Sequence, residues 1–266
     1  MGSGAVPINW YEYRRGWEKV DAEVIEESSV TIFVNGQELV TLMASPRDQE
    51  QLALGFLKNE GLICEMGEVK DVHVSQSGCC VEVWLSHSIE QPERKIITSG
   101  CGGGTTFRDP YATAQPVEDN LTISPGALSN LINQLQQPGS LYSRTRGVHT
   151  SGISDGRKIL AVAEDVGRHN TLDKIVGFCI QQGIPTKGCI LLTTGRISSE
   201  MLRKGAQMGC PLIASRNSPT SLSVSLARSW NITLVGYVRN GRMRVYSHPQ
   251  KVGLAESTPQ LPLAGD

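Results

Sequence analysis

Short apolar runs separated by turn residues dominate the first third of the chain. Thr31–Val34 and Glu38–Met43 flank Asn35-Gly36, a pair that accepts the positive φ angles of a two-residue hairpin turn. These residues therefore predict a β-hairpin. Residues 69–75 and 80–86 predict a second hairpin, because a polar tip that contains a glycine separates the two runs.

The residues between the two hairpins predict a helix. Ser45 is expected to cap its first turn, Pro46 suits the first helical position, and Asp48 completes a pattern like a capping box. Gly61 is expected to end this helix. Further along, Ser124-Pro125 predicts the start of another capped helix.

From about residue 145 onward, apolar strand-like runs alternate with helical segments. The predicted strands are Ile159–Ala163, Ile190–Thr194, Leu212–Ser215, Ile232–Val238 and Met243–Tyr246. The predicted helices run from about Asn170 to Gln182, with a stop at Gly183, from Ser198 to Met208, and from Ser218-Pro219 to Trp230. This alternation predicts an α/β layer structure with a largely parallel sheet, to which a hairpin at Asn240-Gly241 adds an antiparallel edge.

The changes of pattern divide the chain into four regions. Residues 1–28 are an N-terminal extension, and residues 29–123 are an α+β region that carries the hairpins and a glycine-rich loop. Residues 124–250 are the α/β domain. Residues 251–266, rich in Pro, Ala, Gly and Ser, are expected to be a disordered tail.

The length, composition and net charge of the chain argue against several classes of protein. The 266 residues are 39% hydrophobic, enough for one large domain or two modest ones. A formal net charge of -1 argues against a general nucleic-acid binder, although it allows a small anionic ligand. No stretch approaches the roughly 20 apolar residues of a membrane span, and the N-terminus lacks the pattern of a signal peptide. These features predict a soluble cytoplasmic protein with no membrane or nucleic-acid partner.

The cysteines show no disulfide framework. There are seven, an odd number: Cys64, Cys79, Cys80, Cys101, Cys179, Cys189 and Cys210. In a reducing cytosol most are expected to be plain thiols. Those at positions 179, 189 and 210 lie in or before apolar runs and are expected to be small buried hydrophobic residues, and the pair Cys79-Cys80 receives the same interpretation.

Cys101 differs from the other cysteines in its neighbours. It lies in the loop Ser99-Gly100-Cys101-Gly102-Gly103-Gly104, after the apolar pair Ile96-Ile97. The glycines let the backbone approach a ligand closely and turn successive N–H groups toward an anion, which favours the thiolate. Cys101 is therefore a candidate reactive thiol. The alternative is a flexible linker that contains a cysteine.

Three segments lie where a predicted strand hands over to a predicted helix, and each contains an arginine: Arg168, Arg196 and Arg216. Parallel α/β sheets bind ligands at the carboxyl ends of their strands, where helix N-termini offer unpaired N–H groups to phosphate. A guanidinium group binds phosphate in a bidentate way. The junctions therefore indicate a site for an anionic ligand. The alternative is that these arginines pair with surface carboxylates.

Metal and hydrolase chemistry have less support. His149 and His169 are the histidines nearest the junctions, but the zinc deaminase signature and any Cys-x-x-Cys are missing, so they are interpreted as hydrogen-bonding residues and no metal is predicted. The sequence has no Gly-x-Ser-x-Gly elbow, and Ser154 is expected in a turn.

One run in the second half is distinctive: Glu164-Asp165-Val166-Gly167-Arg168-His169-Asn170, followed by Asp173-Lys174. Further segments are Met43-Ala44-Ser45-Pro46, Leu54-Gly55-Phe56 with Glu60-Gly61, Leu234-Val235-Gly236-Tyr237, and Tyr246-Ser247-His248-Pro249-Gln250. Together they resemble, in order and spacing, the formate dehydrogenase accessory sulfurtransferase (FdhD) family. The resemblance covers roughly residues 25–250.

The resemblance implies a sulfurtransferase, a sulfur carrier that accepts sulfur from a cysteine desulfurase as a persulfide on Cys101. It implies transfer of that sulfur to a molybdenum bis(molybdopterin guanine dinucleotide) cofactor before the cofactor enters formate dehydrogenase. The implied fold is a three-layer cytidine-deaminase-like α/β domain with a mixed sheet and no zinc, and the implied assembly is a homodimer. The segment that matches the family's cofactor-binding stretch is Tyr237-Val238-Arg239-Asn240-Gly241-Arg242.

Two positions depart from the family pattern. Gly104 stands where most relatives have the second cysteine of a Cys-x-x-Cys, so the loop lacks the neighbouring thiol that would attack a persulfide and leave a disulfide. Sulfur would then pass directly to the cofactor, need an external thiol, or use a more distant cysteine such as Cys79 or Cys80, which nothing in the sequence places nearby. Asn240 stands where proline is common, but it preserves a tight turn. Two alternatives remain: a cofactor-binding chaperone that transfers no sulfur, and a nucleotide hydrolase or deaminase, which the missing metal ligands count against.

Overall fold

The computed structural model describes residues 4–90, 96–97, 105–107 and 115–254. Cys101 and Gly104 lie outside the described residues, and so does most of the predicted tail, residues 251–266. Just before the chain leaves the described part, Pro249–Val252 forms a short 3-10 helix whose Val252 is buried.

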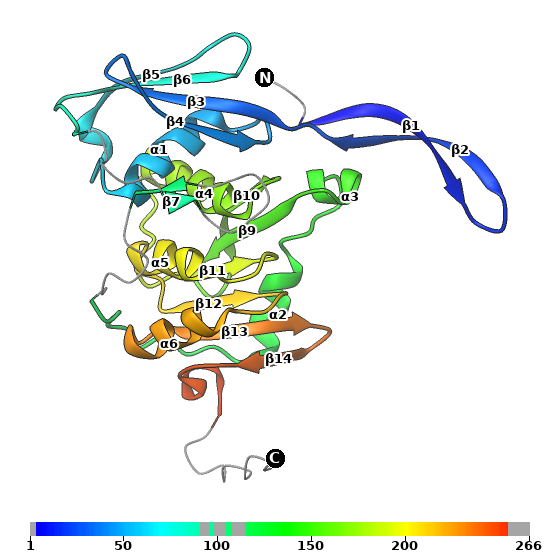
Figure 1. The fold of residues 1–266 in the computed structure, drawn as a ribbon. Helices are drawn as coiled ribbons and strands as arrows, with labels where there is room; N and C mark the ends of the chain where they lie inside the picture. Colours follow the sequence, from blue (N-terminus) through cyan, green and yellow to red (C-terminus); the bar gives the residue numbers. More distant parts are fainter. Residues whose placement is uncertain (1–3, 91–95, 98–104, 108–114, 255–266) are drawn as a thin grey trace.

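The N-terminal extension is a two-stranded ribbon. Strands β1 (Ala5–Tyr13) and β2 (Trp17–Ile25) pair antiparallel and project away from the rest of the molecule (Figure 1). Apolar side chains face one another on one side of the ribbon: Val6 with Val24, Ile8 with Ala22, and Trp10 with Val20. At its base, Glu23 pairs with Arg144 of α3 (Leu141–Thr145), which fixes the point from which the ribbon leaves the body.

A four-stranded sheet follows the ribbon. It has the order β4-β3-β6-β5, with β3 (Ser28–Val34), β4 (Gln37–Ala44), β5 (Val69–Val74) and β6 (Cys80–Leu85). Both predicted hairpins are confirmed. The 3-10 turn Met66–Glu68 precedes β5. Helix α1 (Gln49–Glu60) lies against one face of this sheet, where its leucines and Phe56 share a core with the strands.

The predicted start of α1 is wrong and its predicted end is confirmed. Asp48, not Ser45, is the residue that precedes the helix, and it caps nothing with its side chain. Ser45 is used elsewhere: its Oγ accepts a hydrogen bond from the Val166 amide at 3.1 Å, so tertiary packing overrides the local capping pattern. Gly61 ends α1 in the left-handed region, at φ 74°.

The second half forms a six-stranded sheet of order β10-β9-β11-β12-β13-β14. Its strands are β9 (His149–Ser154), β10 (Ile159–Asp165), β11 (Ile190–Thr193), β12 (Leu212–Ser215), β13 (Thr233–Arg239) and β14 (Arg242–Val245). Only the pairs β11–β12 and β12–β13 are parallel among these strands, so the expectation of a largely parallel sheet is wrong. The cause is β9, which sequence analysis missed and which inserts antiparallel between β10 and β11. Ser154 accordingly ends a strand rather than lying in a turn.

Helices cover both faces of the six-stranded sheet. On one face, α4 (Arg168–Gln182), α5 (Ser199–Gln207) and α6 (Ser221–Ser229) pack on the sheet, and on the other lies α2 (Pro125–Asn133) (Figure 1). Ser124 caps α2 as predicted, whereas α6 begins later than predicted because Thr220 supplies its cap. The fold is therefore mixed α/β. Within the described residues, no helix is long and apolar enough to cross a membrane.

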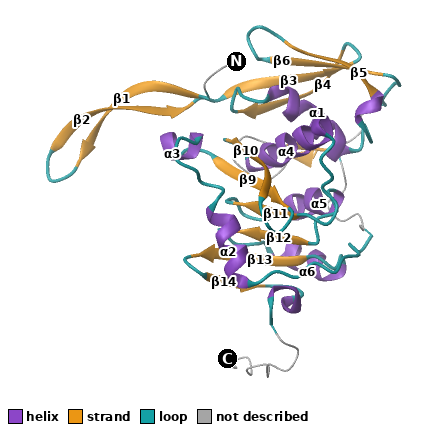
Figure 2. Cartoon of the chain, turned by 180° about the vertical axis from the view of Figure 1, so that it is seen from behind, coloured by secondary structure: helices purple, strands orange, loops and turns teal. Residues whose placement is uncertain are grey.

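The two sheets meet through α1 and α4, which lie side by side between them (Figure 2). Residues 165–174, at the end of β10 and the start of α4, make most of the polar contacts at this junction. The Asp165 carboxylate accepts from the Ser45 amide at 3.0 Å and pairs with Lys174 at 2.7 Å. The Asn170 side chain donates to the Met43 carbonyl at 2.8 Å. Two of the distinctive sequence segments, 43–46 and 164–174, therefore bind one another and join the two halves of the molecule.

Candidate functional site

The hairpin of β13 and β14 has an unusual backbone at both of its bends. Asn240 and Gly241 adopt φ 50° and 75°, which confirms the predicted two-residue turn. Tyr237 also has a positive φ, 55°, where the pairing register of β13 with β14 shifts. A positive φ in a bulky residue is strained and needs support from its surroundings. The support is a stacked neighbour, because the Arg244 guanidinium lies 4.2 Å from the centre of the Tyr237 ring.

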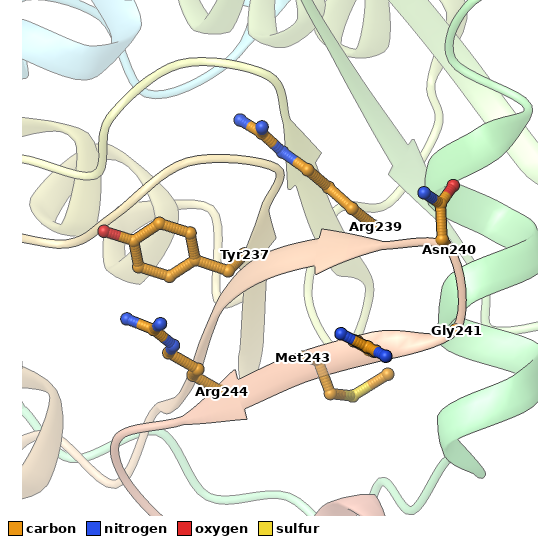
Figure 3. Close-up of a pocket in the computed structure, with 7 residues that line it drawn as sticks. Tyr237, Arg239, Asn240, Gly241, Met243 and Arg244 are labelled. Atoms are coloured by element: carbon orange, nitrogen blue, oxygen red, sulfur yellow. The ribbon is translucent and has the colours of Figure 1, made fainter.

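This hairpin lines a large open pocket of about 1000 Å³ (Figure 3). Its lining residues are Tyr237, Arg239, Asn240, Gly241, Arg242, Met243 and Arg244. Five of the six residues in the predicted cofactor-binding stretch thus line the pocket. Val238 does not: it is fully buried in the core that strands share with α2, because successive side chains of a strand point to opposite faces.

The pocket is strongly basic. Arg239 and Arg242 are direct cross-strand partners, an arrangement of like charges that is unfavourable unless an anion lies between or beside them. Arg244 adds a third guanidinium to the same lining, whose described residues include no acidic side chain. This arrangement favours a multiply charged anion such as a phosphate ester.

A second, smaller pocket of about 350 Å³ adjoins the first, since Arg239 lines both. Its other lining residues are Gln136, Tyr142, Val148, His149, Thr194 and Arg216. The Arg239 Nε donates to the Arg216 carbonyl at 2.9 Å, and the Arg216 side chain bonds Gln136. These bonds hold the two arginines beside the carboxyl ends of β11, β12 and β13. This is the edge of the sheet at which the sequence predicts a site for an anionic ligand.

The three junction arginines do not have equal roles. Arg216 lines the smaller pocket, Arg196 is exposed, and Arg168 is 5% exposed at the start of α4. Arg168 approaches His149 across Gly195: a β-carbon added to Gly195 would lie 3.1 Å from Arg168 Cβ and 3.5 Å from His149 Nδ1. The structure therefore brings these arginines to one edge.

His149 and His169, the two histidines considered as metal ligands, both lie in surroundings that favour the neutral imidazole ring. Burial lowers the pKa of His149, and the positive charge of Arg168 lowers it further. Burial also lowers the pKa of His169, although its Nε2 lies 3.0 Å from a Glu200 carboxylate oxygen that favours the charged ring. A neutral His149 offers the smaller pocket one hydrogen-bond donor and one acceptor.

The cysteines divide by burial. Cys179, Cys189 and Cys210 are buried as predicted, and burial raises the pKa of each thiol, that of Cys179 to about 11. Cys79 is exposed, so its predicted burial is wrong: it lies in the tight turn before β6 rather than in the strand. Cys64 is also exposed. The candidate Cys101 lies outside the described residues.

Sequence reasoning missed several residues that line these pockets, among them Arg244, Gln136 and Tyr142. Arg244 carried a signal, because a residue two positions after Arg242 on a strand shares its face. Gln136 and Tyr142 carried none, since they come from the segment around α3, whose approach to β13 depends on the tertiary fold.

The fold and site define an α/β protein with an arginine-lined pocket at the carboxyl edge of its larger sheet. The FdhD/NarQ family model matches residues 25–253, and the chain belongs to this family. It is 37% identical over 252 residues to the sulfur carrier protein FdhD of Staphylococcus aureus strains Newman and COL, covering 92% of this chain and 95% of each relative. A crystal structure of a candidate formate dehydrogenase accessory protein from Desulfotalea psychrophila is similar with a TM-score of 0.80 and 27% identity, covering 94% of this chain and 99% of that chain.

Proposed function

We propose that this chain is a sulfurtransferase that carries sulfur as a persulfide on Cys101. In this proposal it takes the sulfur from a cysteine desulfurase and delivers it to a molybdenum bis(molybdopterin guanine dinucleotide) cofactor destined for formate dehydrogenase. Family membership and the names of the relatives support the sulfur-carrying role. The observation that carries the proposal is the pocket lined by Arg239, Arg242 and Arg244, which fits an anionic dinucleotide cargo.

The cargo is expected to bind through its phosphates and one guanine. The three arginines supply the positive charge for the phosphates, and the Tyr237 ring stacked on Arg244 offers an aromatic wall for a base. The adjoining pocket adds donors and acceptors from Gln136 and His149 for the polar edge of a base or sugar.

The loading step is a thiol–disulfide exchange. The Cys101 thiolate attacks the outer sulfur of the desulfurase persulfide, the S–S bond of the donor breaks, and the donor cysteine leaves as a thiolate. The new S–S bond leaves a persulfide on Cys101. No electrons are gained or lost overall.

Release of the sulfur has to follow a route with one loop cysteine, because Gly104 stands at the place of the second. We expect a low-molecular-weight thiol to attack the Cys101 sulfur, which frees hydrosulfide for the cargo and leaves a mixed disulfide on Cys101. A second thiol then restores the cysteine. The thiols supply the two electrons that reduce the outer sulfur.

Three further features of the family belong to the proposal: a homodimer, a cytoplasmic location, and a likeness of the second half to cytidine deaminases without their zinc. None of them is needed for the chemistry of Cys101.

The decisive experiment compares sulfur uptake by wild type and Cys101→Ala. Each is incubated with a cysteine desulfurase and labelled cysteine, and intact-protein mass spectrometry measures the gain of one sulfur atom. Cys64→Ala and Cys79→Ala are matched controls, since both thiols are exposed. We expect loss of uptake in Cys101→Ala alone. Equal uptake by all four proteins would overturn the role of Cys101, and normal formate dehydrogenase maturation with Cys101→Ala would favour the chaperone.

A further inference from the structure

The ribbon of β1 and β2 exposes a cluster of large apolar side chains. Six of those that solvent reaches lie on it: Val6, Ile8, Trp10, Tyr11, Tyr13 and Trp17. The three aromatic residues nearest the turn are each at least 66% exposed. In the described part of the chain, the ribbon packs on the body at its base, where Ala5 meets Leu141 and Val148. Beyond this base it projects clear of the body in both views (Figure 1, Figure 2).

A two-stranded ribbon with such a surface is at best marginally stable by itself in water. A sheet of this kind needs a third strand, or another element packed on its apolar face. The apolar face of this ribbon is made of the β1 residues Val6, Ile8 and Trp10, which are 40% to 47% exposed, and of their β2 partners Val24, Ala22 and Val20. The strands nevertheless stay paired along all nine residues of each. The apolar face therefore needs a cover from outside this chain.

The ribbon's own charges are distributed unevenly along its length. Residues 12–19, at the turn, carry three basic and two acidic side chains. Residues 20–27, which run down to the base, carry four acidic side chains and no basic one. Arg144 of the body offsets one of these four by pairing with Glu23. Arg15 at the turn and Glu27 at the base are both exposed.

Two such ribbons are complementary when they run in opposite directions. Each is about 30 Å long, since a strand rises about 3.3 Å per residue. When two lie along one another antiparallel, the turn of one reaches the base of the other, and Arg15 of one copy comes near Glu27 of the second copy. Two-stranded ribbons are strongly twisted, so the two coil round each other and residues from both faces enter the contact. This self-complementarity is what a two-fold symmetric dimer requires.

The exposed apolar area also suits a dimer. A large aromatic side chain buries roughly 150–250 Å², so the exposed parts of the six side chains amount to roughly 600 Å² per copy. Two copies would bury roughly 1,200 Å², the lower end of the range for stable, specific interfaces. Tryptophan and tyrosine are also the residues that most often anchor such interfaces.

We propose that the β1–β2 ribbon is a dimerisation arm, and that the same ribbon of a second copy covers it in antiparallel orientation. The proposed function includes a homodimer, and this inference names the surface that forms it. A second copy is always present at the concentration of the chain itself. A sulfur donor or a client enzyme binds transiently and would leave the apolar face uncovered between encounters.

The first test measures the dissociation constant of the full-length dimer by sedimentation equilibrium. Trp10→Glu places a charge on the apolar face and should raise this constant on the order of a hundredfold, as loss of an aromatic anchor does. Val162→Glu is the matched control, because Val162 is 47% exposed on β10, away from the ribbon, and it should keep the wild-type constant. Circular dichroism checks that each variant retains the folded body.

Charge reversal tests whether the occupant is a second copy. Arg15→Glu and Glu27→Arg should each raise the dissociation constant about fivefold to tenfold at low salt, because like charges then face each other. The double variant should return toward the wild-type constant, since each copy supplies both members of the pair. Arg157→Glu, an exposed arginine away from the ribbon, is the control and should have no effect.

The possible results separate this inference from the rest of the proposed function. A wild-type dimer that Trp10→Glu leaves equally tight, or a double variant no tighter than the single ones, overturns the ribbon as the interface and leaves the homodimer standing. A wild type that is monomeric at every concentration overturns both. Ribbon-dependent binding of a cysteine desulfurase by such a monomer would assign the ribbon to that protein instead. Sulfur uptake on Cys101 is measured separately and is decided by neither result.

Discussion

The backbones of Gly55 in α1 and Gly177 in α4 touch where the two helices cross. A β-carbon added to Gly55 would lie 2.7 Å from the Gly177 amide nitrogen and 1.7 Å from the Asp173 carbonyl oxygen. One added to Gly177 would lie 1.9 Å from the Gln51 carbonyl oxygen. Both obstructing groups are main chain, which cannot move aside without separating the helices. This crossing holds the two halves of the molecule together.

Alanine at either crossing glycine should therefore destabilise the protein severely. We expect Gly55→Ala and Gly177→Ala each to lower the free energy of unfolding by about 4 kcal/mol or more, the size of an overpacked, displaced interface. Chemical denaturation measures the change. Gly126→Ala is the matched control, because nothing lies within 4 Å of its added β-carbon and its position is helical. That control should be neutral or slightly stabilising, and an equal loss in all three would refute the role of the crossing.

Replacing only one partner of the buried Asp165–Lys174 ion pair should lower the free energy of unfolding. Both side chains are buried, at 0% and 1% exposure, and Lys174 also donates to the Ser45 carbonyl at 3.2 Å. Lys174→Met leaves the Asp165 carboxylate buried without its cation, which should cost about 3–5 kcal/mol. Adding Asp165→Asn to this variant should restore part of the lost stability, because the substitution removes the unpaired negative charge of Asp165. A double variant less stable than Lys174→Met would contradict this account.

Local sequence signals were enough for most elements of the fold. Asn35-Gly36 and Asn240-Gly241 mark turns whose backbone requirement is local, and Gly61 marks a helix end for the same reason. Strand β9 was missed because His-Thr-Ser-Gly-Ile-Ser has one large apolar residue. Its burial comes from pairing with strands on both sides, which no local pattern reports.

The site was predictable where neighbours in sequence are neighbours in space. The stretch 237–242 forms one hairpin, so a family-like segment located most of the larger pocket. The junction that contains Arg168 was expected to lie at an anion site, and two residues of the same run, Asp165 and Asn170, bind the 43–46 segment instead of facing a pocket. A carboxylate and an amide in a motif look the same in sequence whether they face a ligand or another part of the chain.

Removing positive charge from the larger pocket should weaken anion binding and its dependence on salt. Arg242→Gln and Arg244→Gln remove one guanidinium each from a lining in which the described part of the chain places no acidic side chain. We expect each to lower the affinity for guanosine diphosphate about tenfold, with a shallower slope of log affinity against log salt. Calorimetric titration at low and high salt measures both quantities.

Of these two variants, Arg244→Gln should also change the stability of the protein. Arg244 stacks on the strained Tyr237, so its loss should also lower thermal stability, whereas Arg242→Gln should leave stability unchanged. Arg14→Gln, on the distant ribbon, is the control for a general charge effect. An equal loss of affinity with Arg14→Gln would show that the pocket does not bind the nucleotide.

The buried histidines should make the protein less stable as the solution becomes mildly acidic. The folded pKa values of His149 and His169 lie below the ordinary value of 6.5, so the unfolded chain takes up protons first. The stabilisation that the two neutral rings give to the folded state is fully present above the pKa of the unfolded chain. It is lost as pH falls through 6.5 toward the pKa values of the folded protein. We expect His149→Asn to flatten the fall in unfolding free energy between about pH 7 and pH 5. His73→Asn should keep the wild-type slope because its ring is exposed. Equal slopes in wild type and His149→Asn would show that His149 is not held neutral by its buried, arginine-flanked position.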